Sequence, residues 1–166
     1  SSPTLTDVTI HANVAGTLGG GAYAEDSTPI LDGVELAGNE TLFGDGGGLH
    51  LDNCQTTGSG VRILDNRAEN AAGGMMVFGG VATLTEAEIR GNVSIEGGGV
   101  YVSSGELLLT HSHISDNVAA WSNGGGLMVA SSDVTLESCA LEDNLASDHG
   151  GGAHLVESRV AGRQLL

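Results

Sequence analysis

A short stretch that recurs six times along the chain decides the fold, and residues 114–129 show it as ISDNVAAWSNGGGLMV. An aliphatic residue is followed three positions later by an asparagine, and then by a glycine triplet and a run of apolar residues. The asparagines lie 25 to 27 residues apart and are Asn13, Asn39, Asn66, Asn92, Asn117 and Asn144. A glycine pair or triplet follows each of them and ends at Gly21, Gly48, Gly74, Gly99, Gly126 and Gly152. A period of this length indicates a repeat architecture in which each unit stacks on the next.

The apolar pattern inside each unit predicts short β-strands. Apolar positions alternate with a period of two, as in residues 100–102 and 127–129, and the repeat shows no helical spacing. Three positions before the asparagines lie the aliphatic residues Ile10, Leu36, Ile63, Ile89, Ile114 and Leu141. A unit this small cannot bury its apolar face alone, so equivalent strands of successive units should pair in parallel, with a rise of about 4.8 Å per unit.

We therefore predict an all-β fold, a right-handed parallel β-helix of about six coils with 25 to 27 residues each. The hand follows from the strong preference of parallel crossovers for right-handed connections. We expect a single domain over residues 1–166. Because neither end carries a recognisable cap over its last coil, we expect this domain to be a fragment of a longer solenoid.

The six asparagines are predicted to form a structural ladder at one corner of the coils. An asparagine side chain both donates and accepts hydrogen bonds, so stacked copies can bond to one another and to the backbone of the turn. Asparagine also tolerates unusual backbone dihedral angles, which we expect these residues to adopt at the corner. The glycines are expected to let the chain bend sharply and approach its neighbours closely.

The pattern in residues 13–24, NVAGTLGGGAYA, and in residues 117–129 resembles the repeats of right-handed parallel β-helix proteins of the pectin-lyase-like superfamily. It is most similar to those of polymorphic outer-membrane and autotransporter-passenger surface proteins, and the resemblance covers residues 5–155. It implies a non-catalytic structural or adhesive module of a secreted or cell-surface bacterial protein. The superfamily also contains pectin-degrading enzymes, so the alternative is a carbohydrate-binding or polysaccharide-degrading protein, either a lyase or a glycoside hydrolase.

Composition excludes several functions. The chain has 21 carboxylates, five arginines and no lysine, which gives a net charge of −16. Such a charge repels the phosphates of nucleic acids, and without lysine there is neither a P-loop lysine nor a Schiff base. No apolar run approaches the 18 residues of a membrane span, so we expect none. The remaining partners are a carbohydrate or another surface protein, with end-to-end self-association as a further expectation.

Motifs that suggest chemistry have structural explanations. Residues 44–52 match a calcium nonapeptide once, but such sites need the nine-residue unit in tandem, so we interpret this run as a turn. His111 and His113 have no third ligand at zinc-like spacing. Arg62 should lie between Glu35 and Glu88 on neighbouring strands, as an ion pair rather than a lyase arginine. We expect no catalytic residue, no metal and no cofactor.

One outward ladder is the candidate contact site for a ligand or partner. The middle residues of the segments after the glycines are Tyr23, His50, Met76, Tyr101, Met128 and His154. Aromatic and methionine side chains on an acidic surface are suited to contact a sugar, a protein or a neighbouring domain.

The two cysteines should remain free thiols. Cys54 and Cys139 lie about three coils apart, which exceeds the Cα separation of about 7 Å that a disulfide allows. We also expect Cys139 to be buried.

The charge leads to a prediction about salt. Carboxylates crowded on a narrow solenoid repel one another, and added ions screen this repulsion. We predict that the melting temperature, followed by circular dichroism, rises as salt is increased from low concentration to about 0.5 M. A flat or falling melting temperature would show that repulsion does not limit stability.

Overall fold

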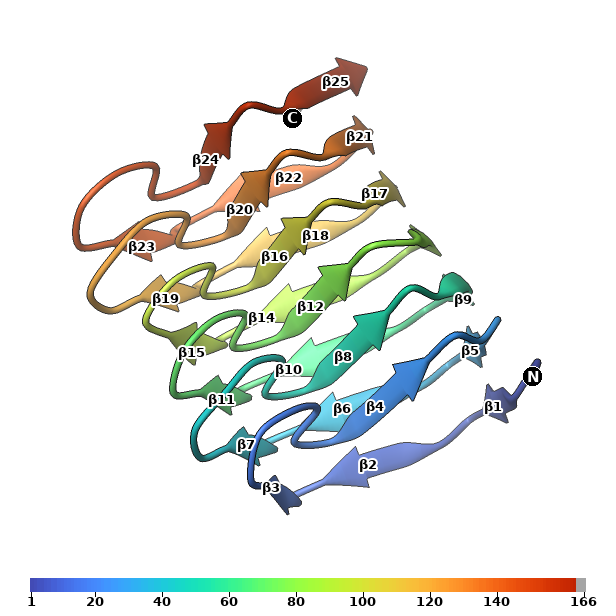
Figure 1. Ribbon diagram of the computed structural model, residues 1–166. Helices are drawn as coiled ribbons and strands as arrows, with labels where there is room; N and C mark the ends of the chain where they lie inside the picture. The colour runs from blue at the N-terminus through green and yellow to red at the C-terminus, as the bar shows by residue number, and fades with distance from the viewer. Residues whose placement is uncertain (164–166) are drawn as a thin grey trace.

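The computed structural model is a stack of coils that climbs from the N-terminus to the C-terminus (Figure 1). It describes residues 1–163, and the last three residues of the domain predicted over residues 1–166 lie outside this range. The described part has 25 strands in four sheets, and all pairs between strands of successive coils are parallel. The predicted parallel β-helix of about six coils is therefore confirmed.

Each coil contributes one strand to each sheet, and the sheets are numbered here in the order in which the chain enters them. The first sheet contains β1 (Thr4–Thr6), β5 (Ile30–Asp32), β9 (Gln55–Ser59), β13 (Val81–Thr85), β17 (Glu106–Thr110), β21 (Asp133–Glu137) and β25 (Arg159–Arg163). The second sheet contains β2 (Thr9–His11), β6 (Glu35–Ala37), β10 (Arg62–Leu64), β14 (Glu88–Arg90), β18 (His113–Ser115) and β22 (Ala140–Glu142).

The third and fourth sheets complete each coil. The third contains β3 (Val14–Ala15), β7 (Glu40–Thr41), β11 (Arg67–Ala68), β15 (Val93–Ser94), β19 (Val118–Ala119) and β23 (Leu145–Ala146). The fourth contains β4 (Ala22–Glu25), β8 (Leu49–Asp52), β12 (Met75–Phe78), β16 (Val100–Ser103), β20 (Leu127–Ala130) and β24 (Ala153–Val156).

The core is a set of aliphatic ladders inside the coils. In the second sheet Leu36, Ile63, Ile89 and Ile114 are in register and fully buried. Leucine and valine ladders from the first and fourth sheets pack against them in one continuous cluster. Residues of similar size therefore lie directly above one another, and this narrow interior is filled without aromatic side chains.

Each corner turns at a residue with a left-handed backbone conformation. Between the second and third sheets the residues with positive φ are Ala12, Gly38, Asp65, Gly91, Asp116 and Asp143. Each of them directly precedes an asparagine of the ladder, and none of the ladder asparagines has a positive φ. The expectation that the asparagines take the unusual dihedral angles is therefore wrong, because the preceding residue makes the bend and the asparagine already lies in the next segment.

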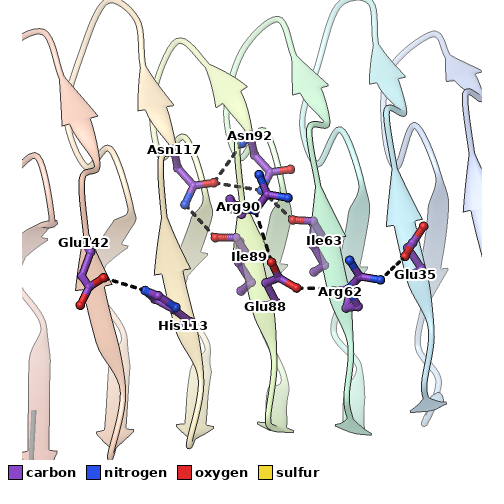
Figure 2. A network of polar contacts seen from close by, with 10 residues as sticks. All are labelled: Glu35, Arg62, Ile63, Glu88, Ile89, Arg90, Asn92, His113, Asn117 and Glu142. Atoms are coloured by element: carbon purple, nitrogen blue, oxygen red, sulfur yellow. Dashed lines mark hydrogen bonds and ion pairs between the residues drawn. The ribbon is translucent and has the colours of Figure 1, made fainter. Parts of the chain in front are cut away.

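The asparagine side chains tie successive coils together, as Asn92 illustrates (Figure 2). Its Oδ1 accepts hydrogen bonds from the backbone N–H and from Nδ2 of Asn66, at 2.9 and 3.0 Å. Its Nδ2 donates to the Ile63 carbonyl and to Asn117 Oδ1, both at 2.9 Å. The same pattern recurs at Asn39, Asn66 and Asn117, so the ladder is continuous through the buried interior of the solenoid.

This packing explains why the last glycine of each cluster lies 18 residues before the asparagine of the next coil. A Cβ added at Gly74 would lie 3.0 Å from Asn92 Cγ, and one added at Gly99 would lie 2.9 Å from Asn117 Cγ. The backbone therefore passes directly over the asparagine side chain of the next coil. Only glycine leaves room for that amide.

Both cysteines are free thiols, as expected, and both are buried. Burial was expected for Cys139 only. The Cys139 thiol donates to the Leu109 carbonyl at 3.3 Å, and Cys54 directly precedes β9, with its Sγ 3.5 Å from Ser27 Oγ. The two thiols thus fill corner positions in different coils.

We predict that Asn92→Ala lowers the free energy of unfolding by about 3 kcal/mol, because it leaves buried donors of Asn66 and the Ile63 carbonyl without partners. Asn13→Ala is the matched control, since Asn13 is exposed and its described side-chain contact is one hydrogen bond to Asn39 Oδ1. This variant should lose less than about 1 kcal/mol. Chemical denaturation measures both, and equal losses would contradict the structural role of the ladder.

Candidate contact surfaces

The six residues of the predicted contact ladder lie in register on the outer face of the fourth sheet. Pairing of β4, β8, β12, β16, β20 and β24 places them in the order Tyr23, His50, Met76, Tyr101, Met128 and His154. Their neighbours on either side, such as Leu49 and Leu51, point into the core. The ladder is thus continuous, with one residue from each coil.

The ladder is not a continuous exposed patch. Tyr23 is 43% exposed, whereas His50 is only 4% exposed and Met76 and Met128 are also buried. The loops that lead into the fourth sheet lie against these side chains, because a Cβ added at Gly46 would come within 2.9 Å of His50 Cβ. One added at Gly124 would come within 2.8 Å of Met128 Cβ. The expectation of an exposed stripe is therefore corrected: only Tyr23, Tyr101 and His154 remain accessible for contact.

Burial shifts the pKa of two residues of this ladder, His50 and Tyr101. Desolvation lowers the pKa of His50, although the nearby carboxylates of Asp45 and Asp52 act in the opposite direction. His50 Nδ1 has no hydrogen-bond partner among the described residues, and the ring lies 5.5 Å from the Tyr23 ring. Desolvation likewise raises the pKa of Tyr101, with added effects of Glu96 and Asp45. His50 and Tyr101 are therefore neutral at pH 7, and the buried His50 serves as a packing residue.

Charged residues on the second sheet form the expected ion-pair ladder (Figure 2). Arg62 donates from Nη1 to Glu35 Oε2 at 2.6 Å and from Nε to Glu88 Oε2 at 3.1 Å. Arg90 adds a contact to Glu88 Oε1 at 3.3 Å, and His113 contacts Glu142 at 3.2 Å further along the ladder. Arg62 thus pairs with carboxylates on both neighbouring strands, which is a structural role.

The motifs that suggested metal binding are loop and strand segments in the structure: residues 44–48 form a loop, residues 49–52 are strand β8, and His113 begins β18. Asp45 Oδ1 accepts hydrogen bonds from Asn70 Nδ2 at 2.8 Å and from the Ala71 N–H at 3.0 Å, which fixes the loop over residues 44–48 to the next coil. His111 has a positive φ at a corner, away from the ion pair of His113. In the part of the chain that the structure describes, no three histidine, cysteine or acidic side chains are grouped to hold a metal ion.

The outer face of the first sheet carries a second ladder that the sequence analysis missed. Its residues are uncharged and in register, in the order Thr4, Ile30, Thr57, Thr83, Leu108, Thr135 and Ala161. Shallow grooves beside it are lined by Ile30, Thr57 and Thr83. The signal in the sequence was the threonine or aliphatic residue at alternate positions of residues 55–59, 81–85, 106–110 and 133–137. In an acidic protein, such an uncharged strip is a candidate contact face.

Acidic residues gather at one end of this face. Glu106 and Asp133 are partners on β17 and β21, and Arg159 follows in the same register on β25. The three residues line one open groove together with Glu157. Among the described residues of the first sheet, Glu106 and Asp133 are the two carboxylates that face each other on neighbouring strands, and no motif in the sequence marks them.

A comparison with protein families agrees with this geometry: the model of the family described as "Right handed beta helix region" matches residues 1–160. The chain belongs to the right-handed β-helix family. No curated protein and no solved structure matches it. The β-helix has, over the described residues, no helix that is long and apolar enough to cross a membrane.

The ion-pair ladder of the β-helix predicts a pH dependence. Partial desolvation raises the pKa of Glu88, but hydrogen bonds and charges of Arg62 and Arg90 outweigh this effect and hold the pKa below its ordinary value. A lowered pKa in the folded state stabilises the protein at neutral pH, and this contribution is lost as the pH falls through the folded-state pKa.

We predict that Glu88→Gln lowers the free energy of unfolding by up to about 1 kcal/mol at pH 7, because Glu88 is partly exposed and solvent screens the pair. The difference from the wild type should vanish when the pH is below the lowered pKa of Glu88. The control is Glu106→Gln, for which the described residues show no ion pair; removing this charge should leave stability unchanged or raise it. Denaturation curves at several pH values measure both, and equal effects would contradict the ion-pair ladder.

Proposed function

We propose that this β-helix is a non-catalytic structural or adhesive module of a secreted or cell-surface bacterial protein, similar to polymorphic outer-membrane and autotransporter-passenger repeats. The observation that carries the proposal is the uncharged ladder on the first sheet, which runs along the described coils of a protein with a net charge of −16. A flat strip of equivalent residues is suited to contact an extended partner.

The rigidity of the scaffold supports this role. Buried asparagines link consecutive coils, and strand pairs on four sheets keep the coils in register. The repeat length varies by only two residues, so every loop is short and the outer faces of the first and second sheets stay open. Such a solenoid holds its contact residues at fixed spacings, and binding then costs little conformational entropy.

The groove with Glu106, Asp133 and Arg159 favours the alternative, a carbohydrate-binding or polysaccharide-degrading protein. Partners on adjacent parallel strands are about 4.8 Å apart. Retaining glycosidases place their two carboxyl groups about 5 to 5.5 Å apart, so these two side chains could act as such a pair. The groove is open to solvent, however, so its charged residues remain hydrated.

Product release from polysaccharides decides between the two functions. We expect the purified protein to release neither reducing ends nor unsaturated sugars from polygalacturonate, xylan, mannan or β-glucan. Release that is lost in both Glu106→Gln and Asp133→Asn would overturn the non-catalytic proposal. Release that persists in these variants would overturn it as well and would place the catalytic groups elsewhere. Thr9→Gln on the second sheet is the matched control for folding and purity.

A further inference from the structure

One edge of the solenoid carries all the variation in repeat length. The loops between the third and fourth sheets lie on the same side of the stack (Figure 1). Two of them, residues 42–48 and 120–126, are seven residues long, and the others have five or six. At the other three corners, the number of residues between register-matched positions of successive sheets is the same in every coil. An extra residue is therefore found only in the loops between the third and fourth sheets.

Both seven-residue loops place an aromatic ring in solvent. Phe43 is 79% exposed and Trp121 is 81% exposed, the highest values among the large hydrophobic residues. Singly exposed apolar residues are common on protein surfaces. Here the chain has only five Phe, Tyr and Trp residues, and its two longest loops each carry one of them at the outside. The rings contribute little to the core, so packing does not explain them.

The two rings occupy equivalent positions. Each is the second residue after its strand in the third sheet, β7 or β19. The Phe43 N–H donates to the Gly16 carbonyl at 3.0 Å and the Trp121 N–H to the Ile95 carbonyl at 3.3 Å, and these carbonyls belong to equivalent residues of the preceding coils. The rings are three coils apart, which is about 14 Å at about 4.8 Å per coil.

Polar groups fill the edge between the rings. Asn70 lies in the coil after Phe43 and donates from Nδ2 to Asp45 Oδ1 at 2.8 Å. Glu96 lies in the following coil and accepts from Ser122 Oγ at 3.3 Å. These contacts orient an amide and a carboxylate, and each group retains hydrogen-bonding capacity for a ligand.

We propose that this edge, formed by Phe43, Asn70, Glu96 and Trp121, binds a neutral polysaccharide that lies along the solenoid axis. The proposal deepens the adhesive function proposed above and rests on it. The aromatic rings stack on the apolar C–H faces of two pyranose rings, while the amide and carboxylate bind sugar hydroxyl groups. The net charge of −16 disfavours uronic-acid chains and phosphates. In an extended β-1,4-linked chain, the length of one sugar residue is close to the rise of one coil along the solenoid axis. The sugars that stack on Phe43 and Trp121 are therefore three residues apart.

The test is isothermal titration calorimetry with cellohexaose and mannohexaose, and with hexagalacturonate as the anionic comparison. We expect binding of a neutral hexasaccharide that weakens at least tenfold in Phe43→Ala and in Trp121→Ala and disappears in the double variant. Trp121→Phe should retain part of the affinity, since it keeps a ring. Phe78→Ala is the matched control, because Phe78 is a half-exposed aromatic residue at another corner. The affinity of this variant for the hexasaccharide should equal that of the wild type. Unchanged melting temperatures establish that the variants fold.

Three results would overturn the proposal: no neutral hexasaccharide binds, hexagalacturonate binds equally well, or the double variant keeps its affinity. Thr83→Lys on the first sheet separates the two surfaces. Affinity that depends on Thr83 and not on the two aromatic residues places the ligand on the first sheet. This result would refute binding at the edge and would leave the proposed adhesive function standing. Release of reducing ends refutes the non-catalytic function, whereas the calorimetric result for the edge would be unaffected.

Discussion

The register between coils depends on the hydrogen bonds of the asparagine ladder. Each buried asparagine receives two donors from the coil before it and gives its own amide to the coil after it and to a carbonyl of the coil before it. Because these groups are buried, a shift of one coil by a single residue would leave several of them unsatisfied. The aliphatic ladders also oppose such a shift, because it would turn their side chains outward. They form no directional bonds, however, and the hydrogen bonds of the amides add that directional constraint. The amides therefore supply the specificity and the side chains of the core supply the burial.

Much of the fold could be predicted because the same residues recur wherever the geometry repeats. Asparagine, glycine and the inward aliphatic residues each respond to a constraint that is identical in every coil, so their spacing is visible in the sequence. The position of the corner bend was harder to predict, because its left-handed residue is alanine at position 12, glycine at 38 and aspartate at 65. Any residue that tolerates positive φ suffices there, so no single letter marks it.

The contact surface was predicted less well for a different physical reason. Alternation with a period of two separates the two faces of a strand, but it does not show whether another segment covers the outer face. At the fourth sheet the glycine-rich loops fold against His50 and Met128, so an outward ladder became largely buried. At the first sheet nothing comparable covers Thr57 and Thr135 among the described residues, and that ladder remained accessible. The difference lies in the path of a loop, which depends on its tertiary contacts.

The spacing of the asparagines also records the length of each loop between the third and fourth sheets. Two of the five intervals are 27 residues long, and each of these contains one seven-residue loop; the shortest interval, 25 residues, contains the five-residue loop. The strands pair with neighbours above and below, so a residue added within them would break strand register. An insertion is tolerated only where the chain leaves the sheets, and there its side chain faces solvent rather than the core. A β-helix with uniform coils can therefore place non-repeating side chains such as Phe43 and Trp121 at chosen levels of the stack, at multiples of the strand spacing, without a change in its core.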